Sequence, residues 1–250
     1  MIPTERIEQI KEILSEKKTV SIKELTERLY VSRSTIRRDL IELEKLGLIR
    51  RDHGGVTRIE NSITEFGSSI RGLENQEEKK KISELVSTYL KDDMSIFIDS
   101  SSTTSYLCKH FKNFNNLIVV TNGLNIANEL RKEENIQLFF TGGRVKNNSY
   151  SVLGQYANDF IKHFYVDITF ISCKCLTLDG VFEADYEQGM LKKYMLQNSK
   201  TKILLADHRK FDCTSCVRFA TLDDFDVIAT DSKPPEKFIE DDGVRGKLIY

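Results

Sequence analysis

The sequence lacks any apolar run long enough to cross a membrane. Its longest runs, such as Leu117–Val120 and Ile203–Ala206, fall far short of the roughly 20 residues that a spanning helix needs. The first residues open directly into a charged, helix-like pattern, so we expect no secretory signal. A composition of 40% hydrophobic and 30% charged residues is that of a globular chain, not a disordered one. We therefore expect a cytoplasmic globular protein.

Cysteine is scarce as well, and its odd count of five makes a disulfide framework an unfavourable interpretation. Two close pairs occur, Cys173 with Cys175 and Cys213 with Cys216, and four thiolates are a possible zinc site. The first pair lies in an apolar, strand-like run, where free cysteine behaves as a small hydrophobic residue. We favour buried thiols, and the sequence predicts neither a metal nor a cofactor.

Charge is unevenly distributed along a chain whose net charge is only −1. Residues 1–58 contain 13 Lys and Arg against 10 Asp and Glu, a net of +3, and the remainder carries a net of −4. A basic segment on an acidic body is the distribution expected when only that segment contacts nucleic acid.

Residues 3–58 have the pattern of a winged helix-turn-helix, with the helix-turn-helix at about 20–39. Apolar spacing predicts a helix over residues 4–17, and Ser21 can cap a second helix. A third helix is predicted from Ser32 to Leu46, ended by Gly47. Short strands over 48–51 and 56–58 then flank a turn, which completes the wing.

The third helix carries the chemistry of a DNA-recognition helix. Its N-terminus offers hydroxyl and N–H groups for phosphates, and its arginines suit guanine edges in a major groove. The alternative is a solvated charged face on which Asp39 neutralises an arginine. A basic wing directly after the helix favours DNA. The predicted DNA-binding residues are Ser32, Arg33, Ser34, Thr35, Arg37, Arg38, Arg50, Arg51 and His53.

Residues 59–76 lack a clean period and are predicted to be a linker, and residues 77–250 alternate strands with helices. This alternation predicts a largely parallel sheet covered by helices on both faces, in which ligands bind at the carboxyl ends of the strands. The predicted strands are Ser95–Asp99, Leu117–Thr121, Gln137–Thr141, Val166–Ser172, Lys202–Ala206 and Asp226–Thr230.

Three segments at those strand ends have the composition of an anion or sugar site. The hydroxyl run after Asp99 suits a phosphate, although simple helix capping also explains it. Gly142-Gly143-Arg144 lets a ligand approach and pair with the arginine, or is a plain loop. Asp207 suits sugar hydroxyls and Lys210 a phosphate, with an internal ion pair as the alternative. No catalytic motif accompanies them, and the four histidines are scattered.

The first segment resembles the signature of DeoR-family bacterial transcriptional regulators. The resemblance is carried, without a gap, by Ser32-Arg33-Ser34-Thr35-Ile36-Arg37-Arg38-Asp39-Leu40, Leu43-Glu44, Gly47-Leu48-Ile49 and Arg51-Asp52-His53-Gly54-Gly55. The rest resembles the family's sensor domain, through Ile98-Asp99 with Thr103-Thr104, Val120-Thr121-Asn122, Thr141-Gly142-Gly143-Arg144, Gly154, Asp167 with Phe170, and Leu205-Ala206-Asp207 with Lys210-Phe211.

This resemblance implies a sensor fold similar to phosphosugar isomerases. It also implies an oligomeric repressor of a carbohydrate operon that a phosphorylated sugar or related metabolite releases from DNA. The predicted effector residues are Asp99, Ser100, Ser101, Ser102, Thr103, Thr104, Asn122, Gly142, Gly143, Arg144, Asp207 and Lys210. A phosphosugar isomerase-like enzyme carrying a DNA-binding appendage is the alternative, which we disfavour because no second acid or base pairs with Asp207.

The chain departs from the family pattern at three points in the sensor domain. Ser101 stands where glycine is common, and Cys175 where a glycine often follows the Phe170 strand. The acidic residue expected before Lys192 is either Glu187 or is displaced by Gln188.

Overall fold

The protein consists of two compact units, Met1–Phe66 and Gly67–Tyr250, each of which is described by itself. The computed structural model describes residues 6–7, 9–10, 13–14, 17, 19–45, 49–52, 55–58, 72, 74–146 and 149–250, and residues 42, 45 and 58 by their backbone only. Within the predicted first helix over residues 4–17, the described residues 6–7, 9–10 and 13–14 are helical, whereas residue 17 is not. The predicted helix end at Gly47 and nearly all of the predicted linker over 59–76 lie outside the described residues.

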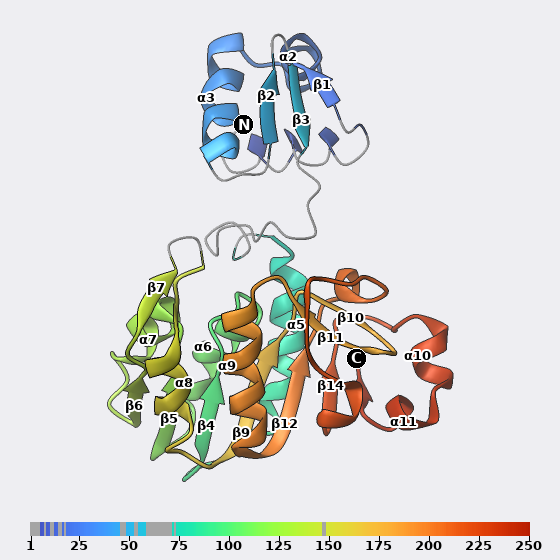
Figure 1. Cartoon of the computed structure of the whole chain (residues 1–250). Coiled ribbons are helices and arrows are strands. Elements are labelled where there is room, and N and C mark those ends of the chain that lie inside the picture. Colours follow the sequence, from blue (N-terminus) through green and yellow to red (C-terminus); the bar gives the residue numbers. More distant parts are fainter. Residues whose placement is uncertain are drawn as a thin grey trace. The chain divides into compact units, whose positions relative to one another are not determined.

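The first unit is a winged helix-turn-helix, as the sequence predicts (Figure 1). Its helices are α2 (Ile22–Leu29) and α3 (Arg33–Lys45), and its strands are β1 (Thr19–Ser21), β2 (Ile49–Asp52) and β3 (Gly55–Arg58). Ser21 caps α2 by accepting a hydrogen bond of 3.0 Å from the Glu24 backbone N–H. The sheet is antiparallel in the order β1-β3-β2. Strand β1 is not predicted from the sequence, because three residues are too few to show a period.

The second unit is built on a seven-stranded sheet in the order β15-β14-β12-β9-β4-β5-β6. Every neighbouring pair of strands in it is parallel, so the predicted architecture is confirmed. All six predicted strands belong to this sheet. Its strands are β4 (Ser95–Ile98), β5 (Leu117–Thr121), β6 (Ile136–Phe140), β9 (Val166–Ser172), β12 (Ser199–Leu205), β14 (Val227–Ala229) and β15 (Leu248–Ile249).

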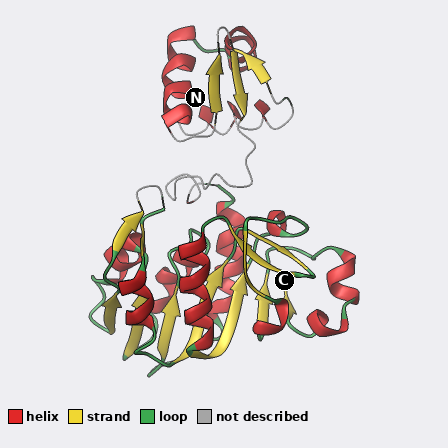
Figure 2. Cartoon of the chain, in the orientation of Figure 1, coloured by secondary structure: helices red, strands yellow, loops and turns green. Residues whose placement is uncertain are grey.

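Helices cover both faces of this sheet (Figure 2), because strand side chains alternate between two apolar layers. In β4, Ile96 and Ile98 belong to one layer and Phe97 to the other. The first layer includes side chains of α5 (Gln76–Ser87), α6 (Cys108–Phe111) and α7 (Leu124–Leu130). The second includes side chains of α8 (Gln155–Ile161), α9 (Tyr186–Gln197), α10 (Glu236–Glu240) and α11 (Asp242–Arg245).

Two small antiparallel sheets are inserted between the parallel strands, and the sequence does not predict them. One is β10 (Cys175–Thr177), β11 (Gly180–Glu183) and β13 (Val217–Ala220), in that order. The other pairs β7 (Arg144–Lys146) with β8 (Ser151–Leu153). Strands of three or four residues give no periodic signal, and their pairing depends on contacts that only the tertiary fold creates.

The expectation of free thiols is wrong for two of the five cysteines. The structure joins Cys175 to Cys213 in a disulfide with a Cα–Cα distance of 5.3 Å. Cys108 and Cys173 are buried thiols, and Cys216 is an exposed one. The bridged residues are 38 positions apart, so neither of the close sequence pairs indicates the bond. Among the described residues, no helix is long and apolar enough to span a bilayer.

We expect Asp167→Asn to lower the free energy of unfolding by about 1 kcal/mol at neutral pH. Ser95 donates its hydroxyl at 2.6 Å and its backbone N–H at 2.9 Å to Asp167 Oδ2, which lowers the pKa of Asp167 below its usual 3.8. A lowered pKa stabilises the fold above the unfolded pKa, and the gain disappears as pH falls through the folded pKa. Urea titrations from neutral to acidic pH measure this difference.

The control is Asp179→Asn at an exposed turn, which we expect to leave stability unchanged across the same pH range. A difference between wild type and Asp167→Asn that persists undiminished in acid would contradict the assignment.

Candidate DNA-binding surface and effector site

Helix α3 presents its predicted DNA-binding residues on one face and buries the opposite face. Ile36, Leu40 and Leu43 are fully buried, which fixes the rotation of the helix on the first unit. Ser32, Arg33, Ser34, Arg37 and Arg38 are exposed and Thr35 is half-buried. The hydroxyl of Ser32 lies 2.8 Å from that of Ser34 and 2.9 Å from that of Thr35, so these hydroxyls gather at the start of the helix.

Asp39 does not neutralise an arginine of this face. Its carboxylate accepts two hydrogen bonds from Arg6, of 2.5 and 2.9 Å, and both residues are buried. Within the described part of the chain, no salt bridge engages Arg33, Arg37 or Arg38. The alternative in which Asp39 neutralises an arginine of the exposed face is therefore not supported, because its carboxylate pairs with Arg6.

The two described arginines of the wing differ in their partners. Arg51 pairs with Glu44 of α3 at 2.8 Å, and its backbone N–H donates to the same carboxylate at 3.2 Å. This contact fastens the wing to the recognition helix. Arg50 has 71% of its side chain exposed and lies 3.4 Å from Asp52. The predicted contact residue His53 lies outside the described residues.

In the second unit, the predicted effector residues follow neighbouring strands of the parallel sheet. Asp99 follows β4, Asn122 follows β5, Gly142 follows β6 and Asp207 follows β12. Parallel strands bring these positions to the same edge of the sheet. Asp99, Asn122 and Asp207 are all at least nine-tenths buried, so their polar atoms face other protein groups or a ligand rather than bulk water.

A buried ion-pair network lies at this edge of the sheet. Lys192 of α9 donates to Glu183 at the end of β11, lies 3.0 Å from Asp99 Oδ2, and donates to the Ser172 carbonyl of β9 at 2.7 Å. Burial opposes the charge on Lys192, but Asp99 and Glu183 outweigh it and raise the pKa of its ammonium. The sequence left Glu187 and Gln188 open as the acid for Lys192, and Glu183 takes that place.

Two of the hydroxyl groups in the segment after β4 form hydrogen bonds within the turn. Asp99 Oδ1 accepts hydrogen bonds from the hydroxyls of Ser101 at 2.8 Å and Thr104 at 2.7 Å, so these two groups hold the turn. Among the described residues, the backbone N–H groups of Ser102 and Thr103 have no acceptor. The segment continues into a short 3-10 helix, Thr104–Leu107.

Three buried polar atoms at the same edge lack a hydrogen-bond partner among the described residues. They are Asn122 Oδ1, Thr141 Oγ1 and Ser172 Oγ, and they stand at the carboxyl ends of β5, β6 and β9. An unsatisfied buried polar group costs about 1–3 kcal/mol, and native structures have few of them. The sequence indicated Asn122 but missed Ser172, because a serine at the end of an apolar strand carries no distinctive pattern.

The glycine loop after β6 approaches the chain closely, but its arginine already has a partner. Gly143 has a φ of +139°, and a Cβ there would lie 2.5 Å from the Leu153 carbonyl oxygen, so only glycine fits. Arg144 is exposed and forms an ion pair with Glu187 of α9. Lys146 pairs with Asp185 at 3.0 Å, which ties the same hairpin to the same helix.

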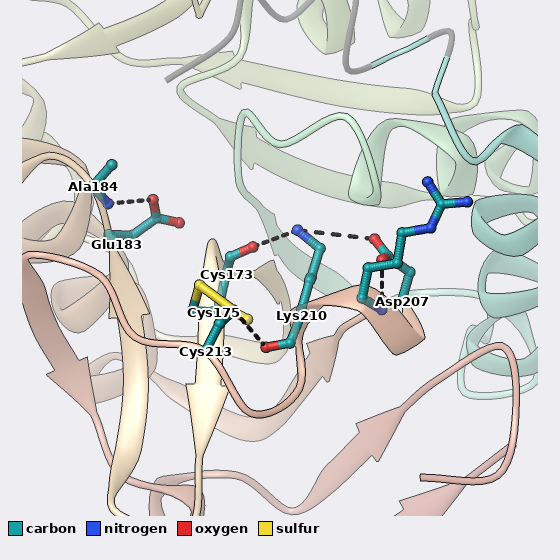
Figure 3. The surroundings of a disulfide bond; sticks show 8 residues. Cys173, Cys175, Glu183, Ala184, Asp207, Lys210 and Cys213 are labelled. Carbon is teal, nitrogen blue, oxygen red and sulfur yellow. Dashed lines mark hydrogen bonds and ion pairs between the residues drawn. A yellow bond between two sulfur atoms is a disulfide. The ribbon is translucent and has the colours of Figure 1, made fainter. Parts of the chain in front are cut away.

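Asp207 and Lys210 lie together but are not a tight ion pair. Lys210 Nζ is 4.0 Å from Asp207 Oδ2 and donates to the Cys173 carbonyl oxygen at 2.6 Å. Asp207 Oδ1 accepts the Arg209 backbone N–H at 3.2 Å. Figure 3 shows the Lys210 ammonium between the Cys173 carbonyl and the Asp207 carboxylate. The Lys210 ammonium therefore has a close contact with a carbonyl oxygen and a more distant one with a carboxylate.

We expect Lys192→Met to lower the free energy of unfolding of the second unit by about 3–5 kcal/mol, because it leaves Asp99 and Glu183 buried without a cation. Thermal and urea unfolding of the full chain measure the loss. Lys193→Met changes the next residue of α9, which is exposed, and should shift stability little. Equal effects of the two substitutions would refute the role of the network.

Two family models match this chain, one in each unit. A family model described as the DeoR-like helix-turn-helix domain matches residues 6–62, and one described as the DeoR C terminal sensor domain matches residues 74–232. Among solved structures, ribose 5-phosphate isomerase from Plasmodium falciparum has a TM-score of 0.39 and 18% identity, covering 54% of this chain and 53% of that chain.

Curated relatives match over almost their whole length. The HTH-type transcriptional regulator GolR of Listeria innocua is 34% identical over 93% of this chain and 92% of its own. The glycerol-3-phosphate regulon repressor of Escherichia coli is 32% identical over 94% and 93%. The HTH-type transcriptional repressor GlcR of Bacillus subtilis is 30% identical over 96% and 93%.

These relatives are named as regulators, so the alternative of an isomerase-like enzyme gives way. The two matching family models cover residues 6–62 and 74–232, which include the helix-turn-helix and six of the seven strands of the parallel sheet. The chain belongs to the DeoR family and is a DNA-binding transcriptional regulator, not an enzyme.

Proposed function

We propose that the protein represses genes of carbohydrate metabolism and that a phosphorylated sugar or related metabolite lowers its affinity for operator DNA. The observation that carries the effector proposal is the set of unsatisfied polar atoms at one sheet edge, on Asn122, Thr141 and Ser172. A ligand with several hydroxyl groups supplies their missing partners. The relative named as a glycerol-3-phosphate regulon repressor is consistent with a phosphorylated effector.

The phosphate of this ligand would lie on the free amides of Ser102 and Thr103. Consecutive backbone N–H groups form an anion-binding concavity, and Ser100 adds a hydroxyl beside them. Lys210, in the segment that follows β12, contributes a cation to this site. Asp207 and Asn122 would then accept or donate hydrogen bonds to the carbon-bound hydroxyls. Gly142 and Gly143 let the backbone approach the ligand, and we assign Arg144 to the rim because Glu187 holds it.

On the DNA side, α3 would lie in the major groove with Ser32, Arg33, Ser34, Thr35, Arg37 and Arg38 toward the bases and phosphates. Arg50, Arg51 and His53 of the wing would contact the neighbouring backbone or minor groove. We assign residues 3–58 to DNA binding, 59–76 to the linker that transmits the signal, and 77–250 to effector sensing. A homo-oligomer in the cytoplasm, acting on repeated half-sites, completes the proposal.

We expect Arg37→Ala and Arg38→Ala each to weaken specific operator binding by roughly 1–3 kcal/mol where the side chain reads a base. Fluorescence anisotropy with a labelled fragment from the gene's own upstream region measures the affinity. Binding should weaken steeply as salt increases, because neutralised phosphates release counterions. The control Arg131→Ala removes an exposed arginine of the other unit. Unchanged affinity in both α3 variants would refute the recognition-helix assignment.

We expect Lys210→Ala to abolish the response to effector while leaving operator affinity intact, because it removes the cation beside the proposed phosphate site. The measurement is the shift in operator affinity caused by a panel that includes glycerol 3-phosphate, ribose 5-phosphate and fructose 1-phosphate. Lys112→Ala, at an exposed position after α6, is the matched control. A Lys210→Ala protein that responds like wild type would remove Lys210 from the site.

A further inference from the structure

The disulfide between Cys175 and Cys213 stands directly beside the proposed effector site (Figure 3). Its Cα–Cα distance of 5.3 Å falls in the range of about 4.4–6.8 Å that an unforced disulfide needs. Cys175 begins β10, and Cys213 follows the segment that carries Asp207 and Lys210. The bridge therefore closes this segment onto the small antiparallel sheet.

The backbone holds the two cysteines together independently of the sulfur–sulfur bond. The Asp212 N–H donates to the Leu176 carbonyl oxygen at 2.9 Å, and Phe211 forms a β-bridge with Leu176. The Phe211 ring also packs edge-to-face on Phe238, with a centroid distance of 5.0 Å. The two sulfurs thus stay adjacent in the reduced protein, which favours both closure and reopening of the bond.

The surroundings separate this pair from the other thiols. Burial raises the pKa of the Cys173 thiol to about 12 and raises that of Cys108 as well, so neither is a ready nucleophile. Cys213 is partly exposed, whereas Cys175 is only 6% exposed. Of the two bridged cysteines, Cys213 is therefore the one that an external oxidant reaches first, and Cys175 is placed to resolve the product.

The backbone carbonyl and the side-chain ammonium of Lys210 both lie close to this cysteine pair in the structure. Cys213 Sγ lies 3.4 Å from the Lys210 carbonyl oxygen, which a reduced thiol can use as a hydrogen-bond acceptor and a disulfide sulfur cannot. The Lys210 ammonium is held by the carbonyl of Cys173, two residues before Cys175. The redox state of the pair thus changes the restraints on the lysine at both its backbone and its side chain.

We propose that Cys175 and Cys213 are a reversible dithiol–disulfide site that sets the mobility of segment 207–213 and thereby the sensitivity of the effector site. The reactant is a low-molecular-weight disulfide such as oxidised glutathione. The effect on effector sensitivity rests on the proposed function, whereas the redox chemistry and the change in mobility do not.

The chemistry is two successive thiol–disulfide exchanges. The Cys213 thiolate attacks one sulfur of oxidised glutathione, forms a mixed disulfide and releases one glutathione thiolate. The Cys175 thiolate then attacks Cys213 Sγ, forms the internal disulfide and releases the second glutathione thiolate. The protein loses two protons and two electrons, and oxidised glutathione becomes two reduced molecules. Excess reduced glutathione reverses both steps.

The disulfide lowers effector sensitivity because it fixes Lys210 in its internal contacts. For a ligand phosphate to recruit this ammonium, the lysine must leave the Cys173 carbonyl, and segment 207–213 must adjust. The cross-link to β10 restricts that adjustment, whereas the reduced segment is free to make it. The oxidised protein therefore stays on its operator at effector concentrations that release the reduced protein.

The first test needs neither DNA nor effector. Full-length protein is equilibrated in glutathione buffers of increasing oxidised fraction, and peptide mapping locates any disulfide while hydrogen exchange follows segment 207–213. We expect one Cys175–Cys213 link, reversible with reductant, and slower exchange of that segment when it forms. Cys216→Ser should behave like wild type and Cys175→Ser should stop at the mixed disulfide. A link from Cys213 to Cys216, or unchanged exchange in the linked protein, overturns the proposal.

The second test compares the concentration of active phosphorylated ligand that half-releases operator DNA from oxidised and from reduced protein. We expect the oxidised protein to need at least about fivefold more ligand, with no difference in Cys175→Ser. Equal or lower midpoints in the oxidised protein overturn the coupling. If no phosphorylated ligand acts in either state, the proposed effector is wrong, and the exchange of segment 207–213 alone decides the redox site.

Discussion

The ammonium of Lys192, buried between Asp99 and Glu183, is the contact on which the sensor unit depends. It joins α9 to the ends of β4, β9 and β11, so the parallel sheet and the inserted antiparallel sheet meet at one charge. The same contact orients Asp99, whose other oxygen holds the hydroxyls of Ser101 and Thr104. A buried charge without partners is costly, and this requirement fixes the turn that we propose for phosphate binding.

In the DNA-binding unit, too, acidic side chains form ion pairs with basic side chains of the same unit. Asp39 forms an ion pair with Arg6, and Glu44 forms one with Arg51. Among the described residues, no carboxylate pairs with the arginines on the exposed face of α3. In the sensor, Glu187 holds Arg144 while Lys210 keeps only a distant carboxylate at 4.0 Å. The positions of the acidic residues therefore distinguish cations in close ion pairs, such as Arg6 and Arg51, from those that we propose to bind a ligand.

Sequence patterns predicted the large elements because each is periodic or capped. Six of the seven strands of the parallel sheet, the buried face of α3 and the Ser21 cap all follow from local spacing. Strands β10 and β11, the partnership of Lys192 with Glu183, and the Cys175–Cys213 bond do not, since each joins short segments whose proximity the tertiary fold creates. The proposed effector residues lie at strand ends, as the sequence places them, but only the structure shows that the hydroxyls of Ser101 and Thr104 bind Asp99 and hold the turn.

Hydrogen exchange of the full chain, with and without a saturating phosphorylated ligand, tests whether one edge of the parallel sheet is the effector site. We expect slower exchange in segments 99–104, 122–123, 141–144 and 207–210, which follow strands β4, β5, β6 and β12 of one sheet. Protection confined to segments away from the carboxyl ends of these strands would contradict it.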